Sequence, residues 1–177
     1  MCTVALAGSR GARGTDRGAM GADFHSQVRS FYEANRQALF TYAVSLAGDR
    51  AVAEDAVQAA ILGLLRRGRL PANPRPFVFR SVRNAIVDGF RSPGRGGDPM
   101  LDATAAVNGS PDPVRVRLVE QCLGRLSDKE RETLVLKVFS GLTFKEIAAV
   151  RRRPQGTVTA RYRRGLEKMR KMLEEDG

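Results

Sequence analysis

Cationic side chains gather on the last patterned segment of the chain, where they follow a helical period. Val158, Tyr162, Gly165, Met169 and Leu173 recur at steps of four, three, four and four, which predicts one apolar helix face. A helix held in a core by this face, with cations pointing outward, can bind the phosphates and base edges of a DNA major groove. The candidates for such contacts are Gln155, Thr157, Thr159, Arg161, Arg163, Arg164 and Lys168.

A helix–turn–helix pattern leads into this basic helix. Thr143 and Glu146 form a capping box, which predicts the start of a short helix, and Pro154 and Gly156 then predict a turn. Side chains at the start of a recognition helix usually reach base edges, whereas later cations usually reach phosphates. Arg161 is therefore the candidate for a bidentate contact with guanine. The alternative for each of these polar side chains is simple exposure to solvent.

The charge of the chain favours a polyanionic partner. The 177 residues carry a formal net charge of +11. Residues 114–177, which include the helix–turn–helix, hold 16 basic and 9 acidic residues, whereas residues 93–113 hold 1 basic and 3 acidic residues. A basic patch on a folded module most often binds nucleic acid. A solvated basic face and a membrane-surface helix are the alternatives, and the small apolar face of the basic helix disfavours the membrane.

Few residues could support catalysis or bind a metal. Cys2, Cys122 and His25 are too few for an ordinary zinc site, which needs four ligands or three and a water molecule. Asp23, His25 and Ser26 cluster without a nucleophile elbow or a glycine-rich loop, so we expect no enzyme, metal or cofactor. No apolar stretch approaches the roughly 20 residues of a membrane span, and the N-terminus lacks signal-peptide features. We therefore expect a cytoplasmic protein without membrane insertion.

Helical periodicity extends through most of the chain, and no strand-like alternation of useful length occurs. Residues 1–22 contain few large apolar groups and are predicted to be disordered, and Met20 is an alternative candidate for the translational start. The first module, residues 23–91, is predicted to contain helices over residues 24–47, about 50–67 and 76–91. Asp49 is the candidate cap of the helix that starts near residue 50, and the apolar stripes of the other two helices include Tyr32 and Phe90. The second module, residues 114–174, is predicted to contain helices over about 114–125 and 127–141 before the helix–turn–helix, and a capping box of Ser127 and Glu130 opens the latter helix.

The segment between these modules has the composition of a linker. Residues 92–113 are rich in Gly, Pro and Asn and carry a net acidic charge, so they cannot form a packed core and predict a flexible tether. The predicted fold class is all-α, with two small helical modules. We expect the modules to fold independently and to move relative to each other in the free protein.

Polar side chains on two helices of the first module form two further candidate sites. Glu54, Asp55 and Gln58 lie close together on the second predicted helix, although this spacing alone favours ordinary solvation of a helix face. On the third predicted helix, basic and amide side chains recur at steps of three, four and seven and share a face. The candidate set on that helix is Arg80, Arg83, Asn84, Asp88 and Arg91.

The order and spacing of these motifs resemble the extracytoplasmic function (ECF) sigma factors, the minimal two-domain members of the sigma-70 family of bacterial transcription initiation factors. Residues 46–58 resemble the family's GD-x-x-x-AED-x-x-Q segment, and residues 77–91 resemble its W-L-x-x-I-A-x-N-x-x-x-D-x-x-R segment. Residues 126–136 resemble L-P-x-x-x-R-x-x-x-x-L. Glu146-Ile-Ala and Gly156-Thr-Val-x-x-Arg complete the pattern, which covers roughly residues 24–173.

The resemblance implies a factor that directs promoter-specific transcription initiation. It implies that Glu54, Asp55 and Gln58 dock on the clamp helices of the beta-prime subunit of core RNA polymerase. The third helix and the preceding loop, residues 70–76, would bind the minus-ten promoter element, where a base is captured from the opened duplex. The basic recognition helix would bind the minus-thirty-five element. An anti-sigma factor is a further candidate partner, since such sigma factors are generally held inactive by one.

The chain departs from the family pattern at the turn of the helix–turn–helix. Arg151, Arg152 and Arg153 replace the usual Leu-Gly-apolar sequence, and a left-handed backbone, which glycine accepts there, costs arginine roughly 1 kcal/mol. We expect Arg151 to lay its methylenes over the core and to extend its guanidinium outward. The alternative function is a helix–turn–helix transcriptional regulator whose first module senses a signal or dimerises, but such a regulator needs neither polar helix of the first module.

Overall fold

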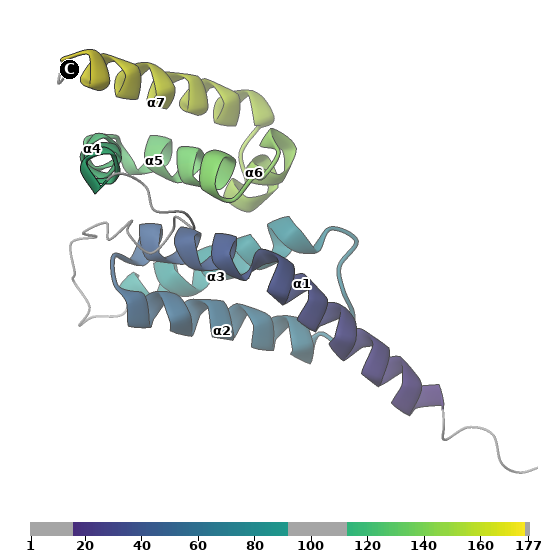
Figure 1. Ribbon diagram of the computed structural model, residues 1–177. Helices are drawn as coiled ribbons and strands as arrows, with labels where there is room; N and C mark the ends of the chain where they lie inside the picture. Colours follow the sequence, from purple (N-terminus) through teal and green to yellow (C-terminus); the bar gives the residue numbers. More distant parts are fainter. Residues whose placement is uncertain (1–15, 92–112, 176–177) are drawn as a thin grey trace, which may run out of the picture.

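The computed structural model describes residues 16–91 and 113–175, and within these ranges the chain is helical and contains no strand (Figure 1). The helices are α1 (Asp16–Ala47), α2 (Arg50–Arg66), α3 (Pro74–Arg91), α4 (Pro113–Gly124), α5 (Asp128–Leu134), η2 (Val135–Phe139), α6 (Phe144–Arg151) and α7 (Gln155–Glu175). The predicted all-α fold class is confirmed. The predicted linker lies outside the described residues, apart from Pro113, which starts α4.

Helices α1, α2 and α3 pack together in the first module. Gly48, with a φ of +66°, follows the end of α1. Asp49 caps α2, as predicted, because its carboxylate accepts a hydrogen bond of 2.8 Å from the backbone N–H of Val52. The apolar side chains that meet between the three helices are buried. They include Val28, Leu39, Tyr42, Ala53, Leu64, Val78, Phe79 and Val82.

Two helix boundaries and three side chains in this module differ from the prediction. Helix α1 begins at Asp16, inside the segment predicted to be disordered, because a nucleated helix elongates at the gain of one hydrogen bond per residue. Helix α3 begins at Pro74, two residues earlier than predicted. Tyr32 and Phe90 were predicted to face the core, but they lie at the edges of their apolar stripes and are 39% and 38% exposed. Phe79, which the pattern missed, is fully buried.

Both predicted capping boxes form in the second module. The Glu130 carboxylate accepts from the backbone N–H of Ser127 (3.3 Å), and that of Glu146 accepts from the backbone N–H of Thr143 (2.8 Å). These bonds satisfy N–H groups that a helix start leaves without intrahelical partners. The caps start α5 and α6, which together with α4 form the surface on which α7 packs.

Helix α7 buries the small residues of its predicted apolar face. Val158 and Gly165 are buried, and a Cβ atom placed on Gly165 would lie 2.9 Å from Cδ1 of Leu134, so the helices α5 and α7 are close at this point. Leu173 was predicted to face inward but is 40% exposed. The reason is that α7 continues beyond the start of α5, where Lys168 pairs with Glu130.

A π-helical turn, η2, continues α5 and was not predicted. The backbone N–H of Ser140 donates to the carbonyl oxygen of Val135, five residues earlier, at 3.0 Å. The widened turn buries Val135 and leaves Val138 56% exposed. An apolar run of this length fits α and π spacing equally well, so the sequence pattern could not distinguish them.

The two modules are in contact in the described structure. Helix α3 contacts α6, and α1 contacts η2 and α5. Leu136 and Ile147 of the second module belong to the same buried apolar cluster as Leu39 and Val78 of the first. The sequence did not predict this shared core, and movement of the modules in the free protein stays a prediction.

The turn between α6 and α7 adopts the strained backbone that the family pattern implied. Arg152 ends α6 with φ +49° and ψ +51°, in the left-handed region, and the next backbone N–H, that of Arg153, donates to the carbonyl oxygen of Ala148 at 3.1 Å. Glycine is the usual residue at such a helix end because it has no Cβ atom. The helix–turn–helix is therefore formed with arginine in the position of that glycine.

Candidate nucleic-acid interface

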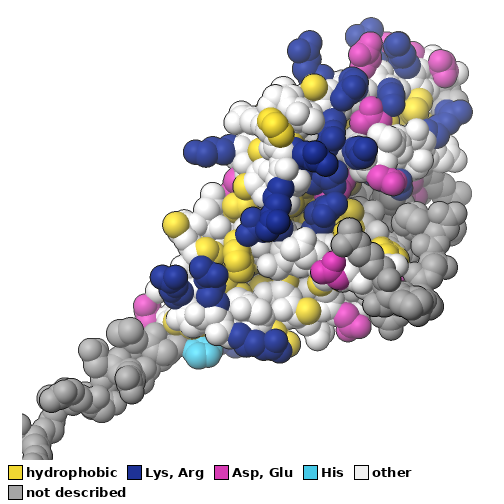
Figure 2. All heavy atoms as spheres, turned by 180° about the vertical axis from the view of Figure 1, so that it is seen from behind, with side chains coloured by type: hydrophobic (Ala, Val, Ile, Leu, Met, Phe, Trp, Pro, Cys, Tyr) yellow, Lys and Arg dark blue, Asp and Glu magenta, His cyan; other side chains and the backbone are white. Residues whose placement is uncertain are grey.

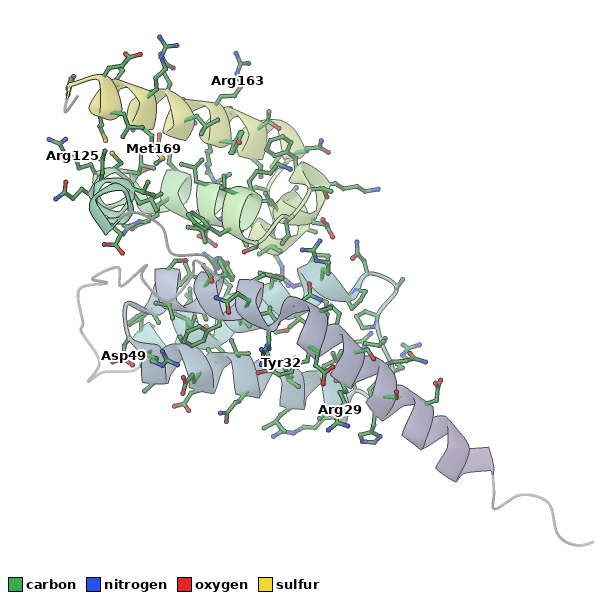
Figure 3. All side chains as sticks on the ribbon, in the orientation of Figure 1. Arg29, Tyr32, Asp49, Arg125, Arg163 and Met169 are labelled. Carbon is green, nitrogen blue, oxygen red and sulfur yellow. The ribbon has the colours of Figure 1, made fainter. Side chains whose placement is uncertain are left out.

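Helix α7 presents a cationic outer surface at the top of the second module. Gln155, Arg163 and Arg164 are exposed, and Figure 3 shows Arg163 projecting away from the body of the molecule. Figure 2 shows Lys and Arg side chains gathered over this module more densely than over the first. This surface can meet a polyanion without any rearrangement of the helix.

Other members of the predicted α7 set are partly occupied by contacts within the protein. The Thr159 hydroxyl donates to the carbonyl oxygen of Gln155 at 3.1 Å, and Thr157 and Thr159 are half-buried. The Lys168 ammonium donates to the Glu130 carboxylate at 2.8 Å. This bond, together with the hydrogen bond from Ser127, holds the pKa of Glu130 below its usual value. Lys168 is thus anchored to α5 at its present position.

Arg161 lies on the side of α7 that is near Arg151, the last residue of α6. Its guanidinium is partly buried, and Nη1 has no hydrogen-bond partner among the described residues. It is close enough to Arg151 for the two cations to repel each other. Arg161 therefore does not share the open surface of Arg163 and Arg164 in this arrangement of the modules.

Helix α3 carries the second predicted DNA-binding set, and the structure divides it. Asn84 and Asp88 are exposed, whereas Arg80 and Arg83 are half-buried. The guanidinium of Arg80 lies 6.0 Å from the ring centroid of Phe77, which stands where the family usually has Trp. The side chain of Arg91 is outside the described part of the chain. The set therefore shares one helix, as predicted, but it does not share one environment.

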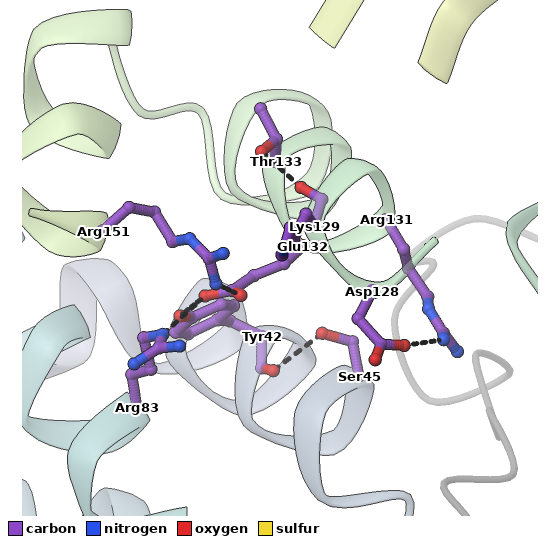
Figure 4. A network of polar contacts seen from close by, with 9 residues as sticks. All are labelled: Tyr42, Ser45, Arg83, Asp128, Lys129, Arg131, Glu132, Thr133 and Arg151. Atoms are coloured by element: carbon purple, nitrogen blue, oxygen red, sulfur yellow. Dashed lines mark hydrogen bonds and ion pairs between the residues drawn. The ribbon is translucent and has the colours of Figure 1, made fainter. Parts of the chain in front are cut away.

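Arg83 belongs to a buried polar cluster that links the two modules (Figure 4). Its Nε donates to Oε1 of Glu132 at 3.0 Å, and the hydroxyl of Tyr42 donates to the same oxygen at 2.8 Å. Oε2 of Glu132 pairs with Nη1 of Arg151. We call Tyr42, Arg83, Glu132 and Arg151 the Glu132 cluster. Because Tyr42 and Arg83 come from the first module and the other two from the second, the cluster spans the contact between them.

Burial determines the ionisation of this cluster. Burial raises the pKa of the Tyr42 phenol well above its ordinary value, which keeps it a neutral hydrogen-bond donor. Burial, and after it the nearby Arg83 cation, lowers the pKa of the Arg151 guanidinium to about 10, so it is still charged at neutral pH. One carboxylate therefore faces two cations at the contact between the modules.

The Glu132 cluster corrects one prediction and was otherwise missed. The guanidinium of Arg151 was predicted to extend outward, but its side chain is only 9% exposed because the buried Glu132 carboxylate, 5% exposed, attracts it inward. The sequence held one usable signal. An arginine at a position where the family has an apolar residue requires a counter-charge within reach, and Glu132 on the preceding capped helix could have supplied it.

The third predicted site lies on the outer face of α2. Glu54, Asp55 and Gln58 are exposed there, while Ala53, Ala56, Val57 and Ala60 face the core. Glu54 accepts a hydrogen bond from Nε of Arg50 at 3.1 Å. Glu54 and Gln58 border a hollow of about 440 Å³, which α1 lines with Tyr32, Arg36, Gln37 and Phe40. Asp55 lies outside this hollow.

These features define a class of protein: an all-helical, two-module protein whose second module is a basic helix–turn–helix of the kind that binds DNA. Comparison with known families narrows the class. Residues 31–96 match sigma-70 region 2, and residues 117–169 match sigma-70 region 4. The first match covers most of the first module and ends five residues past it, and the second match falls within the second module. None of the helices in the described ranges is long and apolar enough to cross a membrane.

Relatives and solved structures agree with the family matches. The chain is 34% identical over 134 residues to the RNA polymerase sigma factor CarQ of Myxococcus xanthus, covering 71% of this chain and 76% of CarQ. It is 28% identical over 163 residues to the ECF sigma factor SigL of Mycobacterium tuberculosis, covering 85% and 90% of the two chains.

Two solved folds are similar at 21% identity. CnrH, in complex with the cytosolic domain of CnrY, gives a TM-score of 0.66, with 90% of this chain and 96% of CnrH covered. RpoE, in complex with the anti-sigma factor NepR from Bartonella quintana, gives 0.67, with 84% and 98% covered.

The chain belongs to the sigma-70 family, and within it to the ECF sigma factors. It is a sigma factor that directs promoter-specific initiation, and its partners are core RNA polymerase and promoter DNA. Sigma factors are initiation factors rather than enzymes. The alternative of a helix–turn–helix regulator is not favoured, because the first module matches sigma-70 region 2.

Proposed function

We propose that the outer face of α2 docks on the beta-prime clamp helices of core RNA polymerase. The observation that carries this proposal is the division of α2 into two faces. Its small apolar residues are buried against α1 and α3, and Glu54, Asp55 and Gln58 remain exposed on the other side. These side chains contribute little to the fold, so their grouping on one face is available for a partner. The hollow beside Glu54 and Gln58 offers a concave surface for a helix.

The proposed minus-ten surface is helix α3 with the loop before it. Asn84 is exposed and can hydrogen-bond a base edge, and the arginines can hold phosphates of the melted strand. Phe77 lies between two guanidinium groups, with Arg67 at 5.3 Å and Arg80 at 6.0 Å from its ring centroid. We assign Arg80, Arg83, Asn84, Asp88 and Arg91 to this surface.

The proposed minus-thirty-five surface is the start and outer side of α7. Gln155, Thr157, Thr159 and Arg161 would reach base edges, and Arg163, Arg164 and Lys168 would contact phosphates. The exposure of Gln155, Arg163 and Arg164 supports this order. Arg161 and Lys168 would have to leave their present positions, Arg161 from its partly buried place beside Arg151 and Lys168 by release from Glu130.

An anti-sigma factor is the third partner that we propose. Two proteins with similar folds were solved in complexes. RpoE was solved with the anti-sigma factor NepR, and CnrH was solved with the cytosolic domain of CnrY. The proposal implies that the partner covers surfaces that core polymerase or DNA would otherwise use.

The test of the polymerase assignment is a double substitution, Asp55→Ala with Gln58→Ala. Both side chains are exposed, so the fold should persist and the affinity for core polymerase should fall, by at least about tenfold if the pair includes one strong contact. The matched control is Asp23→Ala with Gln27→Ala, an exposed acid–amide pair on α1 joined by a 2.7 Å hydrogen bond. Equal affinities of the two double variants for core polymerase would refute the docking assignment.

A further inference from the structure

The Glu132 cluster joins a DNA-binding helix of one module to the helix–turn–helix of the other. Glu132 is 5% exposed on its side chain and lies in α5, yet two of its three partners, Tyr42 and Arg83, come from α1 and α3. The third, Arg151, is the last residue of α6, next to the left-handed turn. One carboxylate of α5 therefore receives groups from α1, α3 and α6, three of the elements that meet at this contact.

The same cluster withdraws Arg83 from the proposed DNA surfaces, and Arg161 lies beside the cluster. Arg83, of the minus-ten set, is only 29% exposed because it pairs with Glu132. Arg161, of the minus-thirty-five set, has a buried Nη1 without a partner among the described residues and lies near Arg151. A guanidinium binds a carboxylate and a phosphate with donors of the same kind, and pairing with Glu132 occupies Nε of Arg83 and neutralises part of its charge, which lowers its affinity for a phosphate.

We propose that Glu132 acts as an internal competitor of promoter DNA, holding the modules closed by occupying Arg83. The proposal rests on the assignment of Arg83 to the minus-ten surface. In the closed molecule the carboxylate takes the place of a phosphate of the melted strand. Binding of DNA to Arg83 removes one of the two first-module partners of Glu132 and leaves only the hydrogen bond from Tyr42. The Glu132–Arg151 pair stays within the second module and keeps the turn of the helix–turn–helix in place.

Closure of the modules weakens DNA binding, and DNA binding in turn opposes closure. A ligand that binds only the open form has an apparent affinity reduced by the fraction of open molecules. Any change that raises the open fraction tenfold should therefore tighten DNA binding tenfold, as long as most molecules remain closed. A second inter-module contact persists in such variants, since Arg75 donates to the carbonyl oxygen of Ser140 at 2.7 Å.

The first measurement is the open fraction, by single-molecule energy transfer in the full chain. Dyes are placed at Leu62→Cys on α2 and Glu174→Cys on α7, both exposed positions, in a Cys2→Ser background where Cys122 is buried. Glu132→Gln removes the charge with little change of shape and should raise the open fraction about tenfold, because hydrogen bonds to a charged group are stronger than neutral ones. Tyr42→Phe should raise it less and leaves the second module intact.

The matched control is Glu130→Gln. Glu130 is also a buried glutamate of α5, at 7% exposure, but its partners Ser127 and Lys168 lie in its own module. Glu130→Gln changes the net charge by the same amount as Glu132→Gln, but it should leave the open fraction equal to that of the wild type. If Glu132→Gln and Tyr42→Phe both leave the open fraction unchanged, or if Glu130→Gln raises it equally, the proposal is overturned.

The second measurement is the affinity of the same proteins for a mixed-sequence single-stranded DNA. Glu132→Gln should bind more tightly than Glu130→Gln, by the factor found for the open fraction. Opening without this gain would overturn the competition. Arg83→Ala distinguishes closure by Glu132 from DNA contact by Arg83. This variant should open the molecule without tightening its binding to DNA. If it gains as much as Glu132→Gln, Arg83 does not contact DNA and the minus-ten assignment is wrong, while closure by Glu132 stands.

Discussion

Arg152 has a left-handed backbone conformation, which destabilises the fold and which the glycine usual in the family would adopt without this loss. Glycine would adopt its backbone, φ +49° and ψ +51°, without a clash of Cβ, so Arg152→Gly should stabilise the protein by about 1 kcal/mol. For a chain of this length that gain corresponds to a rise in Tm of roughly 2–4 °C. Thermal unfolding by circular dichroism would measure it, with Arg153→Gly as the control.

Arg153 is the appropriate comparison because the only non-glycine residue with positive φ in the described ranges is Arg152. At position 153 glycine relieves nothing and adds entropy to the unfolded chain, so no gain is expected there. An equal Tm shift in the two variants would show that the left-handed conformation is not the cause.

For single residues, the sequence predicted backbone conformation and capping better than it predicted side-chain contacts. It indicated the left-handed strain next to Arg151 from the missing glycine, and the cap at Asp49 from local chemistry. It could not place the Arg151 guanidinium, because its partner Glu132 is brought near by tertiary packing, in which α6 contacts α3 and α5 contacts α1, rather than by spacing in the chain. Contacts between distant residues depend on tertiary structure, which periodicity does not encode.

The packing of α5 on α7 depends on one small residue. A Cβ on Gly165 would lie 2.9 Å from Cδ1 of Leu134, a buried side chain that has little room to move. Gly165→Ala should therefore destabilise the protein by about 1–3 kcal/mol through overpacking, even though alanine is the better helix former. Chemical denaturation followed by circular dichroism gives the free energy of unfolding directly.

Gly156→Ala is the control for this helix, since a Cβ there meets nothing within 4 Å. Its effect should have the opposite sign, a gain of up to about 1 kcal/mol from helix propensity. If both substitutions stabilise the protein, α5 and α7 can move apart without loss and their close approach is not a constraint.

Elements were predictable where their ends carry chemical signals. Capping boxes at Ser127 and Thr143 fixed the starts of α5 and α6 within the observed boundaries. The π-helical turn η2 was missed, because its extra residue is set by the way the second module meets α1, not by a local signal. Ser140, at its end, places its hydroxyl 3.5 Å from the carbonyl oxygen of Ala38.

For the whole molecule, two positively charged modules share one core. The family motifs predicted both modules, and the charge distribution predicted that each is basic. Their mutual packing was not predictable, since it joins apolar residues such as Leu39 and Ile147 that each module's pattern already assigned to its own core. The sequence therefore predicted the candidate DNA surfaces but not that Arg83 is withdrawn from one of them.

The balance of charges gives opposite salt dependences for closure and for DNA binding. Residues 23–92 hold 10 basic and 6 acidic residues, and residues 114–177 hold 16 and 9, so the modules repel each other across their contact. Salt screens this repulsion, and it weakens the buried Glu132 cluster much less than exposed pairs such as Arg29–Glu33. Raising NaCl from about 0.1 to about 0.5 M should therefore keep or increase the closed fraction.

DNA affinity should fall over the same range of salt, because each phosphate contact releases counterions bound to the DNA. For single-stranded DNA, each contact contributes a slope of about −0.7 to a plot of log affinity against log salt concentration. Energy transfer in the doubly labelled protein and titration with single-stranded DNA measure the two quantities on one sample. A closed fraction that falls as steeply as the affinity would mean that exposed ion pairs, and not the buried carboxylate and the shared core, hold the modules together.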